Sequence, residues 1–124
     1  MIFVGMGGAV GALLRYIISE YMKPLKERKG IYFPIGTGFI NISGSFLLGI
    51  LYGLYAQGEL SLLLWLLLGI GFCGGYTTFS TFGKEVIDLL LDKQWQTAFW
   101  YMATSVLLSI LTAWAGIHIV RLFY

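Results

Sequence analysis

Four long apolar segments fill nearly the whole chain of 124 residues, and they restrict its possible folds more than any other feature. The segments cover approximately residues 2–22, 32–56, 60–91 and 95–123. A helix that crosses a membrane needs about 20 predominantly apolar residues. Hydrophobic residues make up 58% of the chain and charged residues only 11%. We therefore expect an all-α integral membrane protein with four transmembrane helices, built as one domain over residues 1–124.

The remaining composition argues against several other classes of protein. The net charge is only +2, so no nucleic-acid partner is expected. The single cysteine, Cys73, cannot form an internal disulfide, and His118 has no cysteine or acidic residue at ligand spacing. The sequence contains no Ser/His/Asp set, phosphate-binding loop or carboxylate pair, so we do not expect an enzyme. The start of the chain has no basic segment, so we expect no removable signal peptide.

The third span contains a run that is unusual for a membrane helix. Two adjacent glycines, Gly74 and Gly75, weaken the helix by roughly 1 kcal/mol each relative to alanine. The hydroxyl and aromatic residues that follow are Thr77, Thr78, Phe79, Ser80, Thr81 and Phe82. In hydrocarbon, an opened backbone must be satisfied by protein, ion or water. We expect a break in the third helix at the glycines; the alternative is a small-residue packing surface between helices.

The second span carries a polar stripe. Thr37, Asn41 and Ser45 recur every four residues and therefore share one helix face. Such a stripe on an apolar helix should point toward protein. Asn41 is its strongest member, because an amide offers two donors and an acceptor. The alternative for Asn41 is a hydrogen bond that only joins neighbouring helices.

Two of the ionisable residues within the spans, Arg15 and Glu85, are candidates for a functional role. A charge such as that of Arg15 is costly in a membrane and should face protein or a water-filled vestibule. Alternatively, Arg15 extends to an interface and sets the depth of its helix. Glu85 shares a face with Thr78 and Thr81, and we expect it to be partly buried and either paired or protonated.

The first and fourth spans carry packing and interface signals. Gly7 and Gly11 form a small-xxx-small pair that allows close helix approach. The fourth span places Ser105, Ser109 and Thr112 on one side. Three aromatic residues near its start, Trp95, Trp100 and Tyr101, resemble an interfacial belt.

The inward-facing groups together suit a small anion. They are Asn41, the hydroxyls after Gly75, Ser109, and the rings of Phe79 and Phe82. Most are hydrogen-bond donors, and an aromatic ring is electropositive at its edge. Donors can replace the water of a strongly hydrated anion. The residues alone thus indicate a polar path through the membrane, favour ion conduction over catalysis, and leave a non-transporting assembly factor open.

Three motifs give a more specific indication. The first motif is Gly7-Gly8-x-x-Gly11-Ala12-x-x-Arg15-Tyr16, and the second is the second-span run from Gly36 to Gly49. The third motif is Gly71-Phe72-Cys73-Gly74-Gly75-Tyr76-Thr77-Thr78-Phe79-Ser80-Thr81-Phe82. Together these motifs resemble the Fluc (CrcB) fluoride channels over essentially the whole chain. The resemblance implies an antiparallel dimer in a prokaryotic cell membrane that exports F⁻ passively and relieves fluoride toxicity. The alternative is a small multidrug-resistance-type four-helix transporter. Such exporters need an acidic residue in the first helix, where this chain has Arg15.

The resemblance also implies site residues. Fluoride pores would be lined by Asn41, Phe79 and Phe82, with a polar track of Ser80 and Thr81 and with Ser109 from the fourth span. Arg15 and Glu85 would support a vestibule. A structural Na⁺ at the dimer interface would sit on the backbone carbonyls of Gly74 and Thr77 of both subunits. The sequence departs from the family at Ala113, where a hydroxyl is expected one turn after Ser109, with Thr112 adjacent.

Charge placement predicts the orientation of the subunit. Five basic residues fall on the side of the first and third connections: Lys23, Lys26, Arg28, Lys29 and Lys93. Only Arg121 falls clearly on the side of the termini. Because basic loops stay in the cytoplasm, we expect both termini outside. A chain inserted one way cannot form an antiparallel homodimer, so a homologous partner of opposite bias is expected; the alternative is a homodimer of subunits inserted both ways.

Overall fold

The computed structural model describes residues 1–28 and 34–124, and its regular structure there is helical. The elements are α1 (Ile2–Arg28), α2 (Ile35–Ala56), α3 (Leu62–Leu64), η1 (Trp65–Cys73, a π-helix), α4 (Gly74–Tyr76), α5 (Ser80–Leu91) and α6 (Trp95–Phe123). Four stretches are long and apolar enough to cross a membrane: Ile2–Met22, Ile35–Ala56, Leu62–Leu91 and Trp95–Phe123. The expectation of an all-α chain with four membrane-spanning helices is confirmed.

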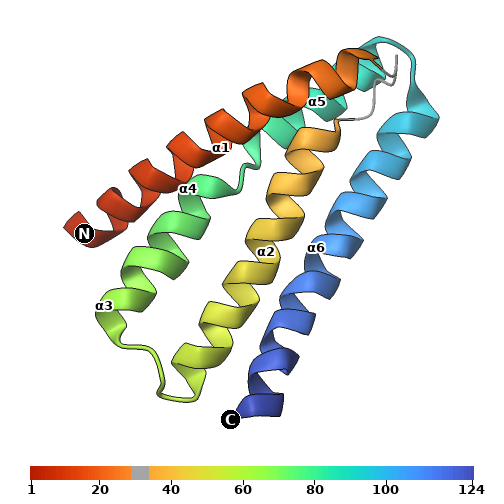
Figure 1. Ribbon diagram of the computed structural model, residues 1–124. Helices are drawn as coiled ribbons and strands as arrows, with labels where there is room; N and C mark the ends of the chain where they lie inside the picture. Colours follow the sequence, from red (N-terminus) through yellow and green to blue (C-terminus); the bar gives the residue numbers. More distant parts are fainter. Residues whose placement is uncertain (29–33) are drawn as a thin grey trace.

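The spans alternate in direction through a single bundle. Helices α2 and α6 run side by side, while α1 packs against η1 and α4 (Figure 1). The α2–α3 connection and the C-terminus lie at one end of the bundle, and the α5–α6 connection lies at the other (Figure 1). This arrangement brings the interrupted third span between α1 and α2.

The third span is broken, but not at the glycines. Segments α3, η1 and α4 form a continuous helical rod, and Gly74 itself has helical angles (φ −63°, ψ −38°). The chain leaves the helix at Thr77, which is extended (φ −77°, ψ 155°), and becomes helical again at Ser80. The prediction of a break is confirmed, and its predicted position was wrong by about one turn. Glycine permits a break without requiring one, and a side chain of α2 binds the backbone at the later position.

The glycines instead allow α1 to approach the third span closely. A Cβ on Gly75 would collide with the carbonyl oxygen of Gly8. A Cβ on Gly7 would collide with the carbonyl oxygen of Leu67, and one on Gly11 with that of Phe72. The small-xxx-small prediction for Gly7 and Gly11 is confirmed, because only a hydrogen atom fits between these backbones.

Two helix ends differ from the sequence-based expectation. A loop was predicted from Lys23, but the backbone of α1 stays helical to Arg28. Residues such as Lys, Glu and Arg have high helix propensity, and outside the hydrocarbon water can satisfy the carbonyl that loses its partner at Pro24. The rest of this basic segment, including Lys29, lies outside the described residues. Helix α2 begins at Ile35 rather than near residue 32, directly after Pro34.

The assignment of Tyr101 to an interfacial belt was wrong. Its side chain is fully buried in a cluster with Val86, Leu89 and Ala98, which joins α5 to α6. Its neighbour Trp100 is exposed, as expected for a belt residue. Adjacent helix positions differ by about 100°, so one of the two can face protein while the other faces lipid.

We predict that Gly11→Ala lowers stability while Gly5→Ala in the same helix does not. The new methyl at position 11 meets the backbone of Phe72, whereas no atom lies within 4 Å of a Cβ at position 5. Overpacking typically costs about 1–3 kcal/mol. Thermal unfolding in detergent should show a lower midpoint for Gly11→Ala alone, and equal midpoints for the two variants would contradict the packing of α1.

Candidate functional site

A pair of hydrogen bonds holds the broken segment against α2. Asn41 Nδ2 donates to the carbonyl oxygen of Thr78 at 3.0 Å, and the Thr78 N–H donates to Asn41 Oδ1 at 2.9 Å. The amide therefore satisfies both backbone polar groups of a residue that has left the helix. Thr78 is buried, where an unsatisfied backbone group would cost about 1–3 kcal/mol.

The side chain of Thr78 begins the next helix. Its Oγ1 accepts a hydrogen bond from the Thr81 N–H at 3.2 Å, which caps the first turn of α5. The backbone of Thr78 is thus fixed by α2, while its hydroxyl orients α5. One residue links the position of the second helix to the direction of the second half of the third span.

A second contact reaches the other side of the break. Tyr76, the last residue of α4, places its hydroxyl 2.9 Å from Ser43 Oγ on α2. Sequence reasoning missed this pair, because Ser43 lies off the polar stripe that contains Asn41. Tyr76 and Ser43 lie on different helices, so their contact leaves no repeating pattern in the sequence.

A groove of about 360 Å³ runs along the break between α2, α5 and α6; most of its surface is apolar, and we call it the polar groove for the polar side chains that line it. Its lining includes Asn41, Ser45, Thr78, Phe79, Phe82, Ser105 and Ser109. The rings of Phe79 and Phe82 lie with centroids 6.2 Å apart, tilted by 36°. The groove therefore combines an amide, several hydroxyls and two aromatic rings, and it contains four of the six residues predicted for the pore.

The other two predicted pore residues lie outside this groove. Ser80 is exposed at the start of α5. Thr81 lines a smaller pocket of about 220 Å³, the carboxylate pocket, together with Ser19, Thr37 and Glu85. Helix α5 therefore presents its hydroxyls on a different side from Phe82.

Glu85 is paired within the protein, as expected. Its Oε1 accepts a hydrogen bond from Thr37 Oγ1 at 2.5 Å. The hydroxyl of Tyr101 donates to Oε2 at 3.5 Å, at the outer limit of hydrogen bonding, and the Tyr101 ring lies 5.1 Å from that of Phe82. Tyr101 thus connects the carboxylate to the aromatic wall of the groove. The sequence analysis missed this role of Tyr101, because its position beside Trp100 led to the prediction of an interfacial belt residue.

Arg15 stays within the bundle rather than in open solvent. Its side chain is half-buried, and its Nε is buried without a hydrogen-bond partner among the described residues. In the fourth span, Thr112 donates to the carbonyl oxygen of Ile42 at 3.2 Å, so this hydroxyl joins α6 to α2. Its neighbour Ala113 faces a different pocket.

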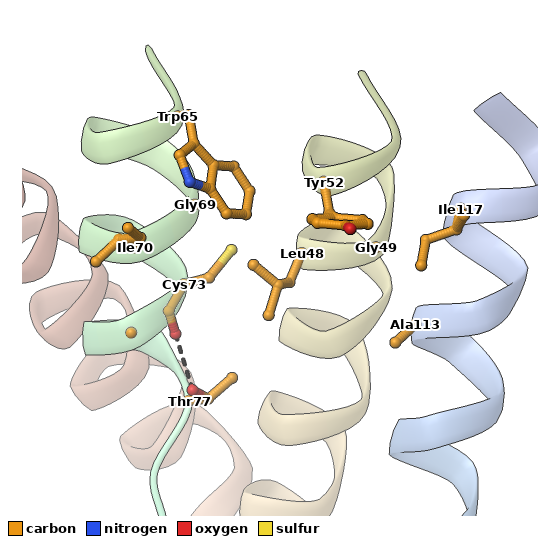
Figure 2. A pocket seen from close by; sticks show the side chains of 11 residues that line it. Leu48, Gly49, Tyr52, Trp65, Gly69, Ile70, Cys73, Thr77, Ala113 and Ile117 are labelled. Carbon is orange, nitrogen blue, oxygen red and sulfur yellow. Dashed lines mark hydrogen bonds between the residues drawn. The ribbon is translucent and has the colours of Figure 1, made fainter. Parts of the chain in front are cut away.

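That neighbouring pocket, the apolar pocket, has a volume of about 500 Å³. Figure 2 shows Trp65 and Cys73 from η1, Leu48 and Tyr52 from α2, and Ala113 and Ile117 from α6 around it. It shares Leu48 and Thr77 with the polar groove, so the two hollows adjoin at the break. The Thr77 hydroxyl donates back to the Cys73 carbonyl at 2.8 Å (Figure 2).

Side-chain ligands for a metal are not assembled in the part of the chain that the structure describes, where no three His, Cys, Asp or Glu residues cluster. Two backbone carbonyls are better placed. The Thr78 N–H is used by Asn41 and the Thr81 N–H by Thr78 Oγ1. The carbonyls of Gly74 and Thr77 therefore lose the partners that a continuous helix would provide.

Comparison with known proteins gives one consistent result. The family described as "CrcB-like protein, Camphor Resistance (CrcB)" matches residues 2–117. A protein of Shewanella woodyi named "Fluoride-specific ion channel FluC" is 40% identical over 120 residues, which are 97% of this chain and 94% of the relative. "Fluoride-specific ion channel FluC 2" of Moorella thermoacetica is 43% identical over 93% of this chain and 91% of its own length. The archaeal "Fluoride-specific ion channel FluC" of Pyrococcus horikoshii is 41% identical over 117 residues, which are 94% of this chain and 91% of the relative.

We predict that Asn41→Ala destabilises the protein more than Asn41→Asp. Alanine removes both hydrogen bonds to Thr78, whereas the neutral carboxyl group of aspartic acid can accept from the Thr78 N–H and donate to its carbonyl oxygen. Each lost bond leaves a buried backbone group unsatisfied, at about 1–3 kcal/mol. Thermal unfolding should rank wild type above Asp and Asp above Ala. Ser45→Ala is the control, because it removes a polar group one turn away on the same face of α2 and leaves both Asn41–Thr78 hydrogen bonds in place. A loss of the same size there would contradict the assignment.

Proposed function

The chain belongs to the CrcB family, and on this premise we propose that it is a fluoride-selective channel that lets F⁻ leave the cell passively and so relieves fluoride toxicity. The observation that carries the proposal is the polar groove, which combines the amide of Asn41, hydroxyls and two phenylalanine rings beside a broken membrane helix. Relatives that share about 40% of their residues with this chain over nearly its full length are named fluoride-specific ion channels. The four apolar helices place the chain in a membrane as a multi-pass protein, and its relatives are bacterial and archaeal.

The groove suits the chemistry of fluoride. F⁻ is small and strongly hydrated, so a pathway must replace its water with hydrogen-bond donors. The Asn41 amide has two N–H groups, and only one is needed for the Thr78 carbonyl. Ser109 adds a hydroxyl from α6, and Phe79 and Phe82 can present their electropositive edges. These four residues form the pore wall in this proposal.

The remaining polar residues extend the path away from the groove. Thr81 and Ser80 continue it along α5, where Thr81 opens into the carboxylate pocket. Arg15 is half-buried, its Nε has no hydrogen-bond partner among the described residues, and its positive charge attracts anions at a vestibule in this proposal. Glu85 supports this end through Thr37 and Tyr101, and its pairing limits its repulsion of an anion.

We predict that liposomes containing the protein release fluoride but not chloride, and that Phe82→Ile sharply reduces the release. Isoleucine roughly keeps volume and apolarity, so folding should persist, but it has no electropositive ring edge. Ion-selective electrodes would measure efflux. Equal fluoride efflux from wild type and variant would remove Phe82 from the pore, while loss of assembly on size exclusion would indicate a packing role instead.

A transporter of the small multidrug-resistance type is the second candidate. Exchange of protons for cationic drugs needs an acidic residue within the membrane, and the first span carries Arg15 instead. Glu85 is hydrogen bonded to Thr37 and Tyr101 on the far side of the break. The donors of the polar groove are also unsuited to a cation, so this candidate is disfavoured.

A second subunit completes the pathway in this proposal. Phe79 is 85% exposed in the single chain, and both the polar groove and the apolar pocket open to the surface. Backbone that has left the helix is tolerated at membrane depth only where protein covers it or water fills it. An antiparallel dimer covers both hollows and brings two broken spans together.

The second subunit is a homologous chain of opposite orientation. The C-terminal end of α1 and the α5–α6 connection, which contains Lys93, lie at one end of the bundle, and the C-terminus, close in sequence to Arg121, lies at the other (Figure 1). Such a bias fixes one orientation, with both termini outside. The antiparallel partner must then be a different chain.

We predict that reporters fused to the C-terminus are active only outside the cytoplasm. A periplasmic reporter such as alkaline phosphatase should work, and a cytoplasmic fluorescent protein should not. The basic residues on the other side account for this orientation. Comparable activity from both reporters would mean insertion both ways and a homodimer.

A structural Na⁺ belongs to the same interface. The carbonyls of Gly74 and Thr77 lack helical partners, and both residues line the apolar pocket. Two subunits supply four such oxygens, which suit a dehydrated monovalent cation. The ion would offset the repulsion between carbonyl oxygens that otherwise face each other across an interface without water.

We predict that replacing Na⁺ with N-methylglucamine weakens the dimer. Because the ligands are backbone oxygens, Thr77→Ser should retain the dependence on Na⁺. Size exclusion and thermal unfolding in the two salts would measure the stability of the dimer independently of ion transport. A dimer that is equally stable in both salts would contradict the site.

A further inference from the structure

Tyr76 touches α2 at a point that no pore residue uses. Its side chain is only 6% exposed, although it precedes a break in a membrane helix. Its ring stacks on that of Phe72, one turn earlier, with centroids 5.7 Å apart and planes 10° apart. The Tyr76 hydroxyl extends beyond this stack to Ser43 on α2.

The Ser43–Tyr76 hydrogen bond joins two hydroxyls whose oxygens lie 2.9 Å apart, and either one can be the donor. Ser43 Oγ also lies 3.1 Å from the Ile40 carbonyl oxygen, so it can donate its single hydrogen there while it accepts from Tyr76. A phenylalanine at position 76 cannot make this bond, and an alanine at position 43 cannot accept it.

Gly44 makes the contact possible. Ser43 and Asn41 are two residues apart and point to different sides of α2. The Tyr76 ring reaches Ser43 by crossing Gly44, where a Cβ would lie 3.0 Å from Tyr76 Cδ2 and would collide with the Thr77 methyl. Helix α2 is therefore held on two sides, by Tyr76 before the break and by Thr78 within it.

We propose that Tyr76 is a positioning residue for the pore: through Ser43 it fixes the rotation of the α3–η1–α4 rod against α2, so that Thr78 meets Asn41 and Phe79 faces the polar groove. The proposal rests on the proposed fluoride conduction. Two anchors on different sides of one helix resist rotation, which the Asn41–Thr78 pair alone cannot do. Without the Tyr76 anchor, the break samples other arrangements in which the pore wall is incomplete.

Removing the anchor should change conduction per channel and the protection of the break. A net hydrogen bond contributes about 0.5–1.5 kcal/mol, so the ratio of correctly arranged to misarranged channels should fall about 2- to 10-fold in Tyr76→Phe, and the time-averaged current per channel should fall by up to that factor. Deuterium exchange of the peptide that covers the break should rise. Because Ser43 and Tyr76 share one hydrogen bond, Ser43→Ala should have the same effect as Tyr76→Phe, and the double variant should be no worse than either single variant. Ser43→Thr keeps the hydroxyl and should therefore retain the wild-type current.

Planar-bilayer recording and hydrogen exchange together test the proposal. Thr104→Val is the matched control, because it also deletes one hydroxyl, but one that bonds to the Trp100 carbonyl of its own helix. Single-channel current does not depend on yield, so a lower amount of folded protein cannot imitate the effect. Unchanged current and exchange in Tyr76→Phe, or strictly additive effects in the double variant, would overturn the proposal.

The two hypotheses fail separately. If the wild type conducts no fluoride, the proposed function fails, and exchange at the break still decides whether Tyr76 positions it. If the wild type conducts and the variants differ only in thermal stability, Tyr76 is a packing residue and the positioning role is overturned.

Discussion

The two hydrogen bonds between Asn41 and the backbone of Thr78 allow a membrane helix to be broken at low cost. A residue that leaves the helix in hydrocarbon needs an acceptor for its N–H and a donor for its carbonyl oxygen. A primary amide provides both in one plane, at 3.0 and 2.9 Å. The rest of the site depends on this pairing, because it frees the carbonyl of Gly74, lets Thr78 cap α5, and turns Phe79 out of the helical rod.

Much of the fold could be predicted from the sequence, since hydrocarbon permits so few structures. Segments of about 20 apolar residues predict spanning helices, and a stripe such as Thr37–Asn41–Ser45 predicts the inward face of α2. The break in the third span was predictable, but its position was not. Gly74 and Gly75 weaken a helix, yet both stay helical, with Gly75 packed closely on Gly8, and only the three-dimensional position of Asn41 selects Thr78.

The site was predictable only where residues repeat along one helix. Asn41, Phe79, Phe82 and Ser109 meet at the groove, but Thr81 belongs with Glu85 in another pocket. Tyr101 was misplaced because its neighbour Trp100 is a true surface aromatic. Pairs between distant helices, such as Ser43 with Tyr76 and Thr37 with Glu85, depend on how the helices rotate against each other, and no local pattern encodes that rotation.

Polar groups in this protein serve two purposes that compete for the same atoms. Asn41 uses one N–H and its oxygen to hold the break, which leaves its second N–H for an ion. Selectivity in this account comes from how rigidly the remaining donors and ring edges are held, because a loose wall would also accept larger anions such as chloride. Rigidity and selectivity are therefore set by the same contacts with α2.

The reversal potential across a planar bilayer tests this account most directly. With a fluoride gradient in one direction and a chloride gradient in the other, the account predicts a reversal potential at the equilibrium potential of fluoride. A reversal potential that follows chloride, or lies midway between the two, would contradict a fluoride-selective path along the broken helix.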